Sequence, residues 1–150
     1  MELTVSLDAQ DLRYEEKKRF LEAQGLKASI AFPLLIDRYT SELMQYLRLC
    51  CLTASDGPLD SYDYTEPLSS SNERAALSAL RQGCEDALAR YPESEAEDAA
   101  LMENSKLFAM CTRNQRMAVK LRRNEKRILL RTIRTCDTAL DALEGRAVSA

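Results

Sequence analysis

The chain contains no histidine, so its five cysteines are the side chains best suited to nucleophilic chemistry, metal binding or disulfide formation. Without histidine, the chain cannot form a Ser-His-Asp triad, a Cys-His pair or an H-E-x-x-H zinc site. The cysteines have no regular spacing and form no C-x-x-C pair, which argues against zinc binding and against a secreted disulfide framework. We expect reduced thiols that pack mostly as small apolar side chains. They lie at Cys50, Cys51, Cys84, Cys111 and Cys136.

Carboxylates and glycines form no catalytic pattern either. Glu97 and Asp98 are neighbours, but they fall in an acidic, helix-forming stretch where nothing favours the burial needed for acid–base catalysis. The four glycines are scattered, and neither a G-x-x-x-x-G-K-[ST] nor a G-x-G-x-x-G motif occurs. We therefore assign no catalytic, cofactor-binding or metal-binding residue, and we expect the chain alone not to be an enzyme.

Positive charge is concentrated between Arg113 and Arg134, where nine basic residues accompany one acid, although the whole chain carries a net charge of −3. Four of these basic residues recur along one side of the expected helix at spacings of four, three and four. We interpret this set as a surface that binds a protein partner with an acidic surface. The four residues are Arg116, Lys120, Arg123 and Arg127.

Two other interpretations of the basic helix remain open. Its charges can simply be solvated on the side opposite a buried apolar stripe. The helix can also resemble a calmodulin target or a nucleic-acid-binding element. Two observations argue against nucleic-acid binding. The helix has no aromatic residue to stack on bases, and the isoelectric point of the chain is near 5.2.

These side chains are expected to be positioned by a mainly α, single-domain bundle of about five helices, with a short extended N-terminal segment. Alternation in residues 3–7 favours a strand, and Pro33 makes residues 28–37 an extended edge segment. Glycine and proline are scarce elsewhere, and Leu, Ala, Glu, Arg and Lys favour helix. The helices are expected over residues 13–24, 41–53, 72–91 and 113–143, with a short helix that begins at Ser94–Glu97 and carries Leu101 and Met102.

Capping residues mark most of these boundaries. Gly25 is a candidate C-terminal cap, and Asn72 a candidate helix start. Ser94–Glu97 and Thr112–Gln115 both resemble capping boxes, in which two side chains satisfy each other's backbone N–H groups. Thr40 or Ser41 can cap the helix that follows the edge segment.

The remaining segments complete a single domain over residues 1–150. The Ser-, Asp-, Gly-, Pro- and Tyr-rich segment 54–71 is expected to be a flexible loop, and residues 145–150 a frayed tail. No apolar run is long enough to span a bilayer, and no signal peptide is evident at the N-terminus. We expect an intracellular, reducing location without membrane contact.

On the long C-terminal helix, apolar residues mark one face. We expect Leu121, Leu129, Ile133 and Leu140 to face inward, and Arg123 and Lys126 to stay exposed. The basic surface proposed above would then lie beside this stripe.

Several segments, in this order, resemble the C-terminal substrate-binding domain of SET-domain protein-lysine methyltransferases of the Rubisco large-subunit type. Together they cover nearly the whole chain, and residues 54–71 match least. No single segment is specific, but their order is. The segments are VSLDAQDLRYEEKKRFLEAQGL, AFPLLID followed by SELMQYLRLCCL, YPESEAEDAALME, and NQRMAVKLRRNEKRIL.

This resemblance implies a helical lobe that helps to hold the protein substrate of an adjoining SET domain. The SET domain would bind S-adenosylmethionine and transfer its methyl group to lysine. The family's cofactor-binding Asn-His motif cannot be present without histidine, so no catalytic or cofactor residue carries over, and no cofactor is expected in this chain. The resemblance implies the chloroplast stroma in a plant or alga, and otherwise the cytoplasm or nucleus. The alternatives are a helical scaffold or adaptor without methyl transfer and, third, a basic-helix nucleic-acid-binding module.

Overall fold

The computed structural model describes residues 1–35, 39–91 and 100–149, and it describes only the backbone of residues 105, 107 and 146–149. The fold is mainly α with a small two-stranded sheet, which confirms the expected fold class. Residues 100–103 are also helical. In chain order the elements are β1 (Glu2–Ser6), α1 (Tyr14–Ala23), β2 (Ser29–Pro33), α2 (Ser41–Cys50), the 3-10 turn η1 (Leu59–Ser61), α3 (Ser70–Ala89), α5 (Ser105–Met110) and α6 (Arg113–Ser149).

The two strands pair although α1 separates them in sequence. β1 and β2 run antiparallel, with Leu3 opposite Phe32, and both of these side chains are buried. Leu3 also lies against Gly83 of α3, where a Cβ would be in ordinary van der Waals contact with its methyl groups at 3.5 and 3.7 Å. The alternation in residues 3–7 thus marks a real strand, and the segment around Pro33 is extended as expected.

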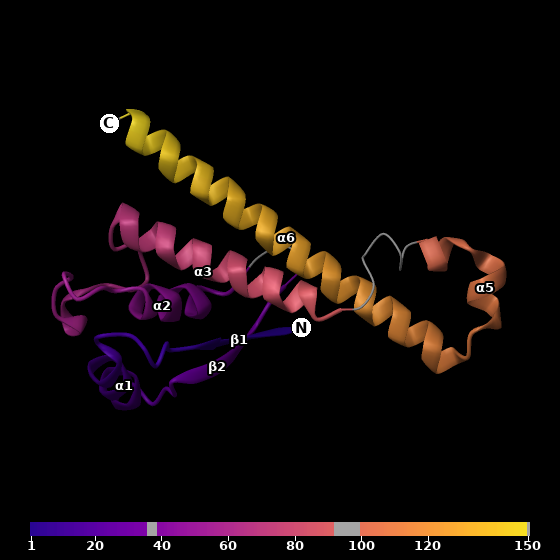
Figure 1. Cartoon of the computed structure of the whole chain (residues 1–150), viewed down its shortest axis with the longest axis horizontal. Coiled ribbons are helices and arrows are strands. Elements are labelled where there is room, and N and C mark those ends of the chain that lie inside the picture. The colour runs from indigo at the N-terminus through magenta and orange to yellow at the C-terminus, as the bar shows by residue number, and fades with distance from the viewer. Residues whose placement is uncertain (36–38, 92–99, 150) are drawn as a thin grey trace.

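The helices stack beside this sheet. α2 packs on α3, and α6 crosses the outer side of α3 (Figure 1). The core is an apolar cluster formed by residues of both strands, α1, α2, α3, α6 and the turn η1. Its most deeply buried members include Leu21, Leu34, Leu43, Leu77, Leu80, Cys84, Leu129 and Cys136.

Thr40, one of the two candidate caps of α2, and the cap at Gly25 are confirmed, whereas the predicted start of α3 is wrong and α2 ends at Cys50 instead of near Thr53. Thr40 caps α2 by accepting a hydrogen bond from the Leu43 amide, and Gly25 after α1 has a φ of 76°, a conformation that glycine adopts without strain. Asn72 does not open α3. The cap is Ser69, three residues earlier, whose hydroxyl accepts from the Asn72 amide, while the Asn72 side chain is buried and donates to the Arg48 carbonyl at 3.0 Å.

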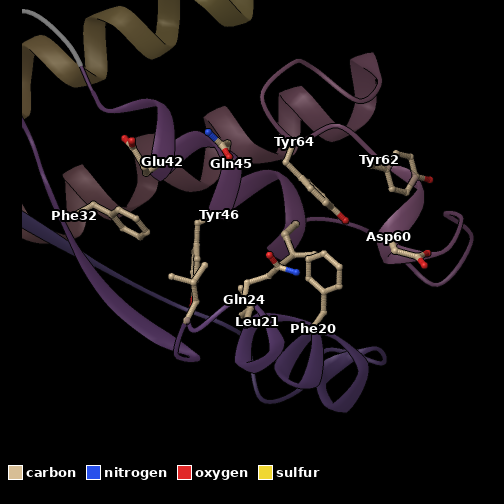
Figure 2. A pocket seen from close by; sticks show the side chains of 12 residues that line it. Phe20, Leu21, Gln24, Phe32, Glu42, Gln45, Tyr46, Asp60, Tyr62 and Tyr64 are labelled. Atoms are coloured by element: carbon tan, nitrogen blue, oxygen red, sulfur yellow. The ribbon is translucent and has the colours of Figure 1, made fainter.

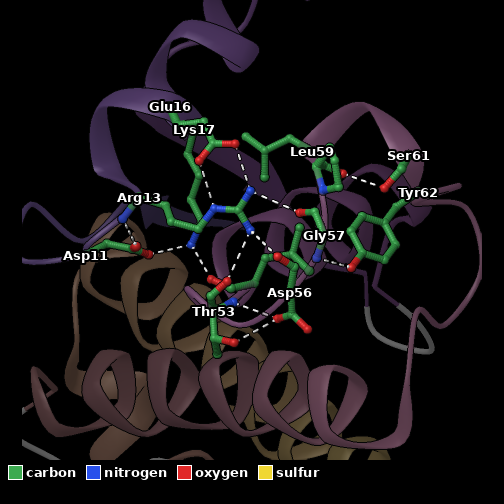
Figure 3. Close-up of polar contacts among 12 residues, drawn as sticks. Asp11, Arg13, Glu16, Lys17, Thr53, Asp56, Gly57, Leu59, Ser61 and Tyr62 are labelled. Atoms are coloured by element: carbon green, nitrogen blue, oxygen red, sulfur yellow. Dashed lines mark hydrogen bonds and ion pairs between the residues drawn. The ribbon is translucent and has the colours of Figure 1, made fainter.

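A fully buried lysine joins α1 to the end of α2 (Figure 3). The Lys17 ammonium donates to the carbonyls of Cys50 (2.9 Å) and Leu52 (2.7 Å) and pairs with the Asp11 carboxylate. The last carbonyls of a helix have no partner within it, and a cation there also suits the helix dipole. Burial alone would raise the pKa of Asp11, but the hydrogen bond from Lys17 helps to hold it below its ordinary value.

The start of the segment 54–71 is held at the N-terminal end of α1 by hydrogen bonds from Arg13. The Arg13 guanidinium donates to the carbonyls of Thr53 (3.1 Å) and Gly57 (3.0 Å) and pairs with Glu16 (Figure 3). Further along, Leu59 is buried in the core. The flexibility expected of this segment stays a prediction, but part of the segment is anchored.

A second buried ion pair joins α2 to α3. Arg48 donates two hydrogen bonds to the Glu73 carboxylate, at 2.9 and 3.0 Å, and a third to the Tyr64 carbonyl at 2.9 Å. The paired geometry satisfies both charges inside the protein. Helices α2 and α3 and the loop before α3 are thereby fixed to one another.

Within the described residues, the cysteines form no disulfide bond. Cys84 and Cys136 are fully buried on α3 and α6, and burial raises their pKa values to about 11 and about 12. Burial likewise raises the pKa of Cys50 to about 12 and that of Cys51 to about 11. These thiols are protonated at neutral pH and act as small apolar side chains.

Candidate protein-docking surface

The long helix α6 has two parts with different surroundings. Its C-terminal part lies along α3, and its N-terminal part projects beyond α3 toward α5 (Figure 1). Leu129, Cys136 and Leu143 are buried at intervals of seven residues, which keeps them on the side facing α3. Arg81 of α3 donates to Asp137 of α6 at 2.7 Å and strengthens this contact. The helix runs on to Ser149, beyond its expected end at Leu143.

The projecting end of α6 starts at a capping box, as the sequence predicts. The Thr112 hydroxyl accepts from the Gln115 amide at 3.1 Å, and the Gln115 side chain accepts from the Thr112 amide at 2.8 Å. This reciprocal pair satisfies two N–H groups that the helix leaves without a partner. The similar box expected at Ser94–Glu97 lies outside the described residues, as do Glu97 and Asp98.

The four basic residues singled out from the sequence lie on this projecting part. Lys120 is exposed, and its ammonium lies 5.8 Å from the centre of the Phe108 ring on α5. Arg116, Arg123 and Arg127 are half-buried, and the Arg123 guanidinium lies 3.8 Å from the Met102 sulfur. Arg123 is therefore less exposed than expected.

Lys126 contradicts its predicted exposure. It is only 1% exposed, and its ammonium lies 5.2 Å from the centre of the Tyr91 ring. The neighbouring Glu125 accepts a hydrogen bond from the Tyr91 hydroxyl. Burial and this bond raise the pKa of Tyr91 to about 12. Glu125 and Lys126 thus attach α6 to the end of α3, so Lys126 is not part of the exposed positive surface.

Leu121 is the other wrong prediction, because it points outward. Its side chain is 59% exposed, and Met117, one turn earlier, is 60% exposed. The buried residue here is Val119, which lies seven residues before Lys126. The sequence pattern predicts one continuous apolar face along the whole helix. In the structure, the buried side of each turn depends instead on which parts of the protein pack against that turn.

The result is a mixed surface at the projecting end of α6. Met117 and Leu121 stand next to the exposed Lys120 and the half-buried Arg116. We call these four residues the docking surface. Exposed apolar side chains in a basic setting can bury area on a partner while the charges select an acidic one. The sequence signalled the charges but not the apolar residues.

Neither a cluster of metal-ligand side chains nor a membrane-spanning helix is found among the described residues. Within residues 1–35, 39–91 and 100–149, no group of three or more Cys, Asp or Glu residues is placed to hold a metal ion. In the same ranges, no helix has the length and apolar character to cross a bilayer.

Comparison with known proteins identifies the family. A family model described as Rubisco LSMT substrate-binding matches residues 8–129. The chain belongs to this family. The match leaves out β1 and most of the part of α6 that lies along α3, but it includes the docking surface.

The chain is also similar to a curated protein, the chloroplastic Ribulose-1,5 bisphosphate carboxylase/oxygenase large subunit N-methyltransferase of Nicotiana tabacum. It is 30% identical over 154 residues, which cover 95% of this chain and 30% of the relative. Two solved structures have the same fold. The SET domain of LSMT bound to MeLysine and AdoHcy has a TM-score of 0.81 at 24% identity, covering 97% of this chain and 35% of that one. Rubisco LSMT bound to AdoMet has a TM-score of 0.78 at 23% identity, with the same two coverages. The chain thus spans about a third of the length of these relatives.

Proposed function

We propose that this domain holds the protein substrate of a SET-domain protein-lysine methyltransferase, and that the docking surface on α6 makes the contact. The parent enzyme would use S-adenosylmethionine bound in its SET domain, and this domain would supply affinity for the substrate. In a plant or alga, the chloroplast is the expected compartment, as for the tobacco relative. The observation that carries the proposal is the pair of exposed side chains Met117 and Leu121 beside basic residues on α6.

Charge supports an acidic protein as the partner. The segment from Arg113 to Arg134 has a net charge of +8, whereas the rest of the chain has a net charge of −11. A local positive field of this kind speeds the encounter with an acidic surface. The acidic remainder of the molecule would repel a polyanion, which disfavours nucleic acid. A scaffold or adaptor role would use the same surface, but without methyl transfer in the parent protein.

The proposal can be tested by charge reversal on the docking surface. Rubisco, which the tobacco relative's name gives as substrate, is the first protein to test by surface plasmon resonance. With Arg116→Glu and Lys120→Glu together, association at about 0.15 M salt should slow by about tenfold. The matched control is Arg19→Glu with Arg74→Glu, two exposed arginines on α1 and α3, and it should change little.

Binding measurements at high salt and with DNA distinguish a protein partner from a nucleic-acid partner. Apolar contacts by Met117 and Leu121 should leave measurable protein binding at about 1 M salt, where the Debye length is about 3 Å. DNA binding would instead fall steeply with salt, with a slope of about −0.9 per phosphate neutralised. Submicromolar binding to random duplex DNA, or association unchanged by the double reversal, would contradict the proposal. Reading the gene of the parent protein for a SET domain separates the methyltransferase from the adaptor.

A further inference from the structure

The aromatic side chains of this protein are concentrated at one pocket. The chain has six tyrosines, three phenylalanines and no tryptophan, and five of these nine rings line a single pocket of about 500 Å³. The pocket lies between α1, α2, β2 and the loop around η1, on elements other than α6 (Figure 2). Its aromatic residues are Phe20, Phe32, Tyr46, Tyr62 and Tyr64.

The rings form two walls. On one side, Phe20, Tyr64 and Tyr62 follow one another with ring centres 6.0 and 6.2 Å apart and planes tilted by 56° and 57°. On the other side, Phe32 and Tyr46 lie 5.3 Å apart with a tilt of 57°. Figure 2 shows the two groups on either side of the space above Leu21 and Gln24.

Backbone hydrogen bonds hold the tyrosines in place. Tyr46 donates to the Lys27 carbonyl at 2.9 Å, and the Tyr62 oxygen accepts from the Gly57 amide at 2.8 Å. The Tyr64 hydroxyl donates to the carbonyl of Leu59. Because the hydroxyl groups are bonded to backbone, the half-buried Tyr62 and Tyr64 offer the pocket mainly their rings, whereas the buried Tyr46 borders the pocket with little exposed surface. The walls are therefore both aromatic and preorganised.

The charge around the pocket has one sign. Among the described residues that line it, Glu42 and Asp60 are acidic, and none is lysine or arginine. Both carboxylates are exposed and lie toward opposite ends of the rim (Figure 2). Gln45 uses its amide nitrogen to bond Ser41 at 3.2 Å, which leaves its amide oxygen as an acceptor. The rim therefore attracts a cation, and the interior offers ring faces and few hydrogen-bond acceptors.

We propose that this pocket binds the alkylammonium group of a lysine side chain on a partner protein, and that it favours the methylated form. Aromatic rings attract ammonium cations through their quadrupole, most strongly where water is excluded. An unmethylated ammonium is compact and strongly hydrated, and it needs acceptors for three N–H groups. Methylation removes that need and adds apolar surface. The inference rests on the proposed function, because proteins that lysine methyltransferases modify carry such side chains.

Titration of the full chain with short peptides tests this inference. Each peptide carries one central residue flanked by glycines: lysine, trimethyllysine, or a neutral analogue with a tert-butyl group in place of trimethylammonium. Changes in the NMR spectrum give the affinities and locate the site. We expect trimethyllysine to bind about tenfold more tightly than the neutral analogue, with lysine between them. Equal affinity for charged and neutral peptides would overturn the proposal, as would no saturable shift at the pocket residues.

Substitutions at the pocket give a second readout. Phe20→Leu keeps an apolar side chain but removes a ring, and it should weaken trimethyllysine binding about fivefold. Tyr14→Leu is the matched control, because Tyr14 is an aromatic residue of α1 that does not line this pocket. Glu42→Gln with Asp60→Asn alters only exposed groups, so it preserves the fold, and it should weaken binding about threefold. If neither pocket variant lowers the affinity, the pocket is not the site.

The peptide titration is independent of the docking surface. Loss of peptide binding with unchanged binding to an acidic protein would overturn the pocket proposal alone. Peptide binding that persists while Arg116→Glu and Lys120→Glu leave protein association unchanged would overturn the docking surface alone.

Discussion

The buried ammonium of Lys17 makes a sharp prediction for stability. In Lys17→Met the side chain stays unbranched and apolar but is one atom shorter and loses the three N–H donors of the ammonium. The carbonyls of Cys50 and Leu52 then lose their partner at the end of α2, and the Asp11 carboxylate loses its counter-ion. A buried acceptor left unpaired costs about 1–3 kcal/mol, and removing one member of a buried ion pair costs about 3–5 kcal/mol. We therefore expect the free energy of unfolding to fall by about 3–5 kcal/mol.

Urea denaturation followed by circular dichroism at the helix band measures this loss. With a slope of about 2 kcal/mol per molar urea, the midpoint should fall by about 2 M. Lys18→Met is the matched control, because Lys18 is the next residue on α1 and only half-buried. Its unfolding free energy should change by less than about 0.5 kcal/mol.

Two results would refute the reasoning about Lys17. One is a loss below about 1 kcal/mol, which would mean that water reaches the two carbonyls or that they find other donors. The other is an equal loss in Lys17→Met and Lys18→Met, which would point to helix propensity or surface charge as the cause.

Further predictions concern the core, the thiols, pH and the cofactor. Leu129→Ala should lower the free energy of unfolding by about 2–5 kcal/mol and Leu121→Ala by less than about 0.5 kcal/mol, and similar losses in denaturation would contradict the burial described above. Cys84 and Cys136 should resist a thiol reagent at pH 7.5 until the chain is unfolded in guanidinium, so rapid labelling of the native protein would count against their burial. The pKa of Asp11 is lower in the folded state than in the unfolded state, where it is about 3.9. The carboxylate therefore stabilises the fold above about pH 4, and this contribution is lost as the pH falls through the folded-state pKa. The difference in unfolding free energy between wild type and Asp11→Asn should accordingly shrink below about pH 4. Calorimetric titration of the chain alone with S-adenosylmethionine should give no heat of binding, and micromolar affinity would contradict the assignment of the cofactor to a separate SET domain.

The sequence could predict features that depend on local chemistry. The caps at Thr40, Gly25 and Thr112–Gln115 follow from hydrogen bonds between residues at most three apart, or from the backbone freedom of glycine, and all three are as predicted. Ser69 was missed in favour of Asn72 because a run of three serines before Asn72 offers several possible caps. Tertiary contact selected one of them, because the Asn72 side chain is needed at the Arg48 carbonyl.

Burial that depends on contacts between distant parts of the chain could not be predicted from local sequence patterns. Lys17 and Lys126 look like ordinary surface lysines of amphipathic helices, and each is buried by partners far away in sequence. Leu121 looks like a core residue, but its side chain is 59% exposed, whereas that of Leu129 is fully buried. The docking surface was therefore predicted for its charge and missed for its apolar part.

The way α6 is held has a mechanical consequence. Its 37 residues make a rod of about 55 Å, because each residue adds 1.5 Å, and only the C-terminal part is fixed along α3. The part from Arg113 to Asn124 then acts as a lever arm of about 18 Å, with its fulcrum at Glu125 and Lys126, which contact Tyr91 after α3. A rotation of about 10° at the fulcrum would swing the docking surface through about 3 Å. Repacking of a few side chains between α3 and α6 can therefore re-aim the docking surface without unfolding any helix.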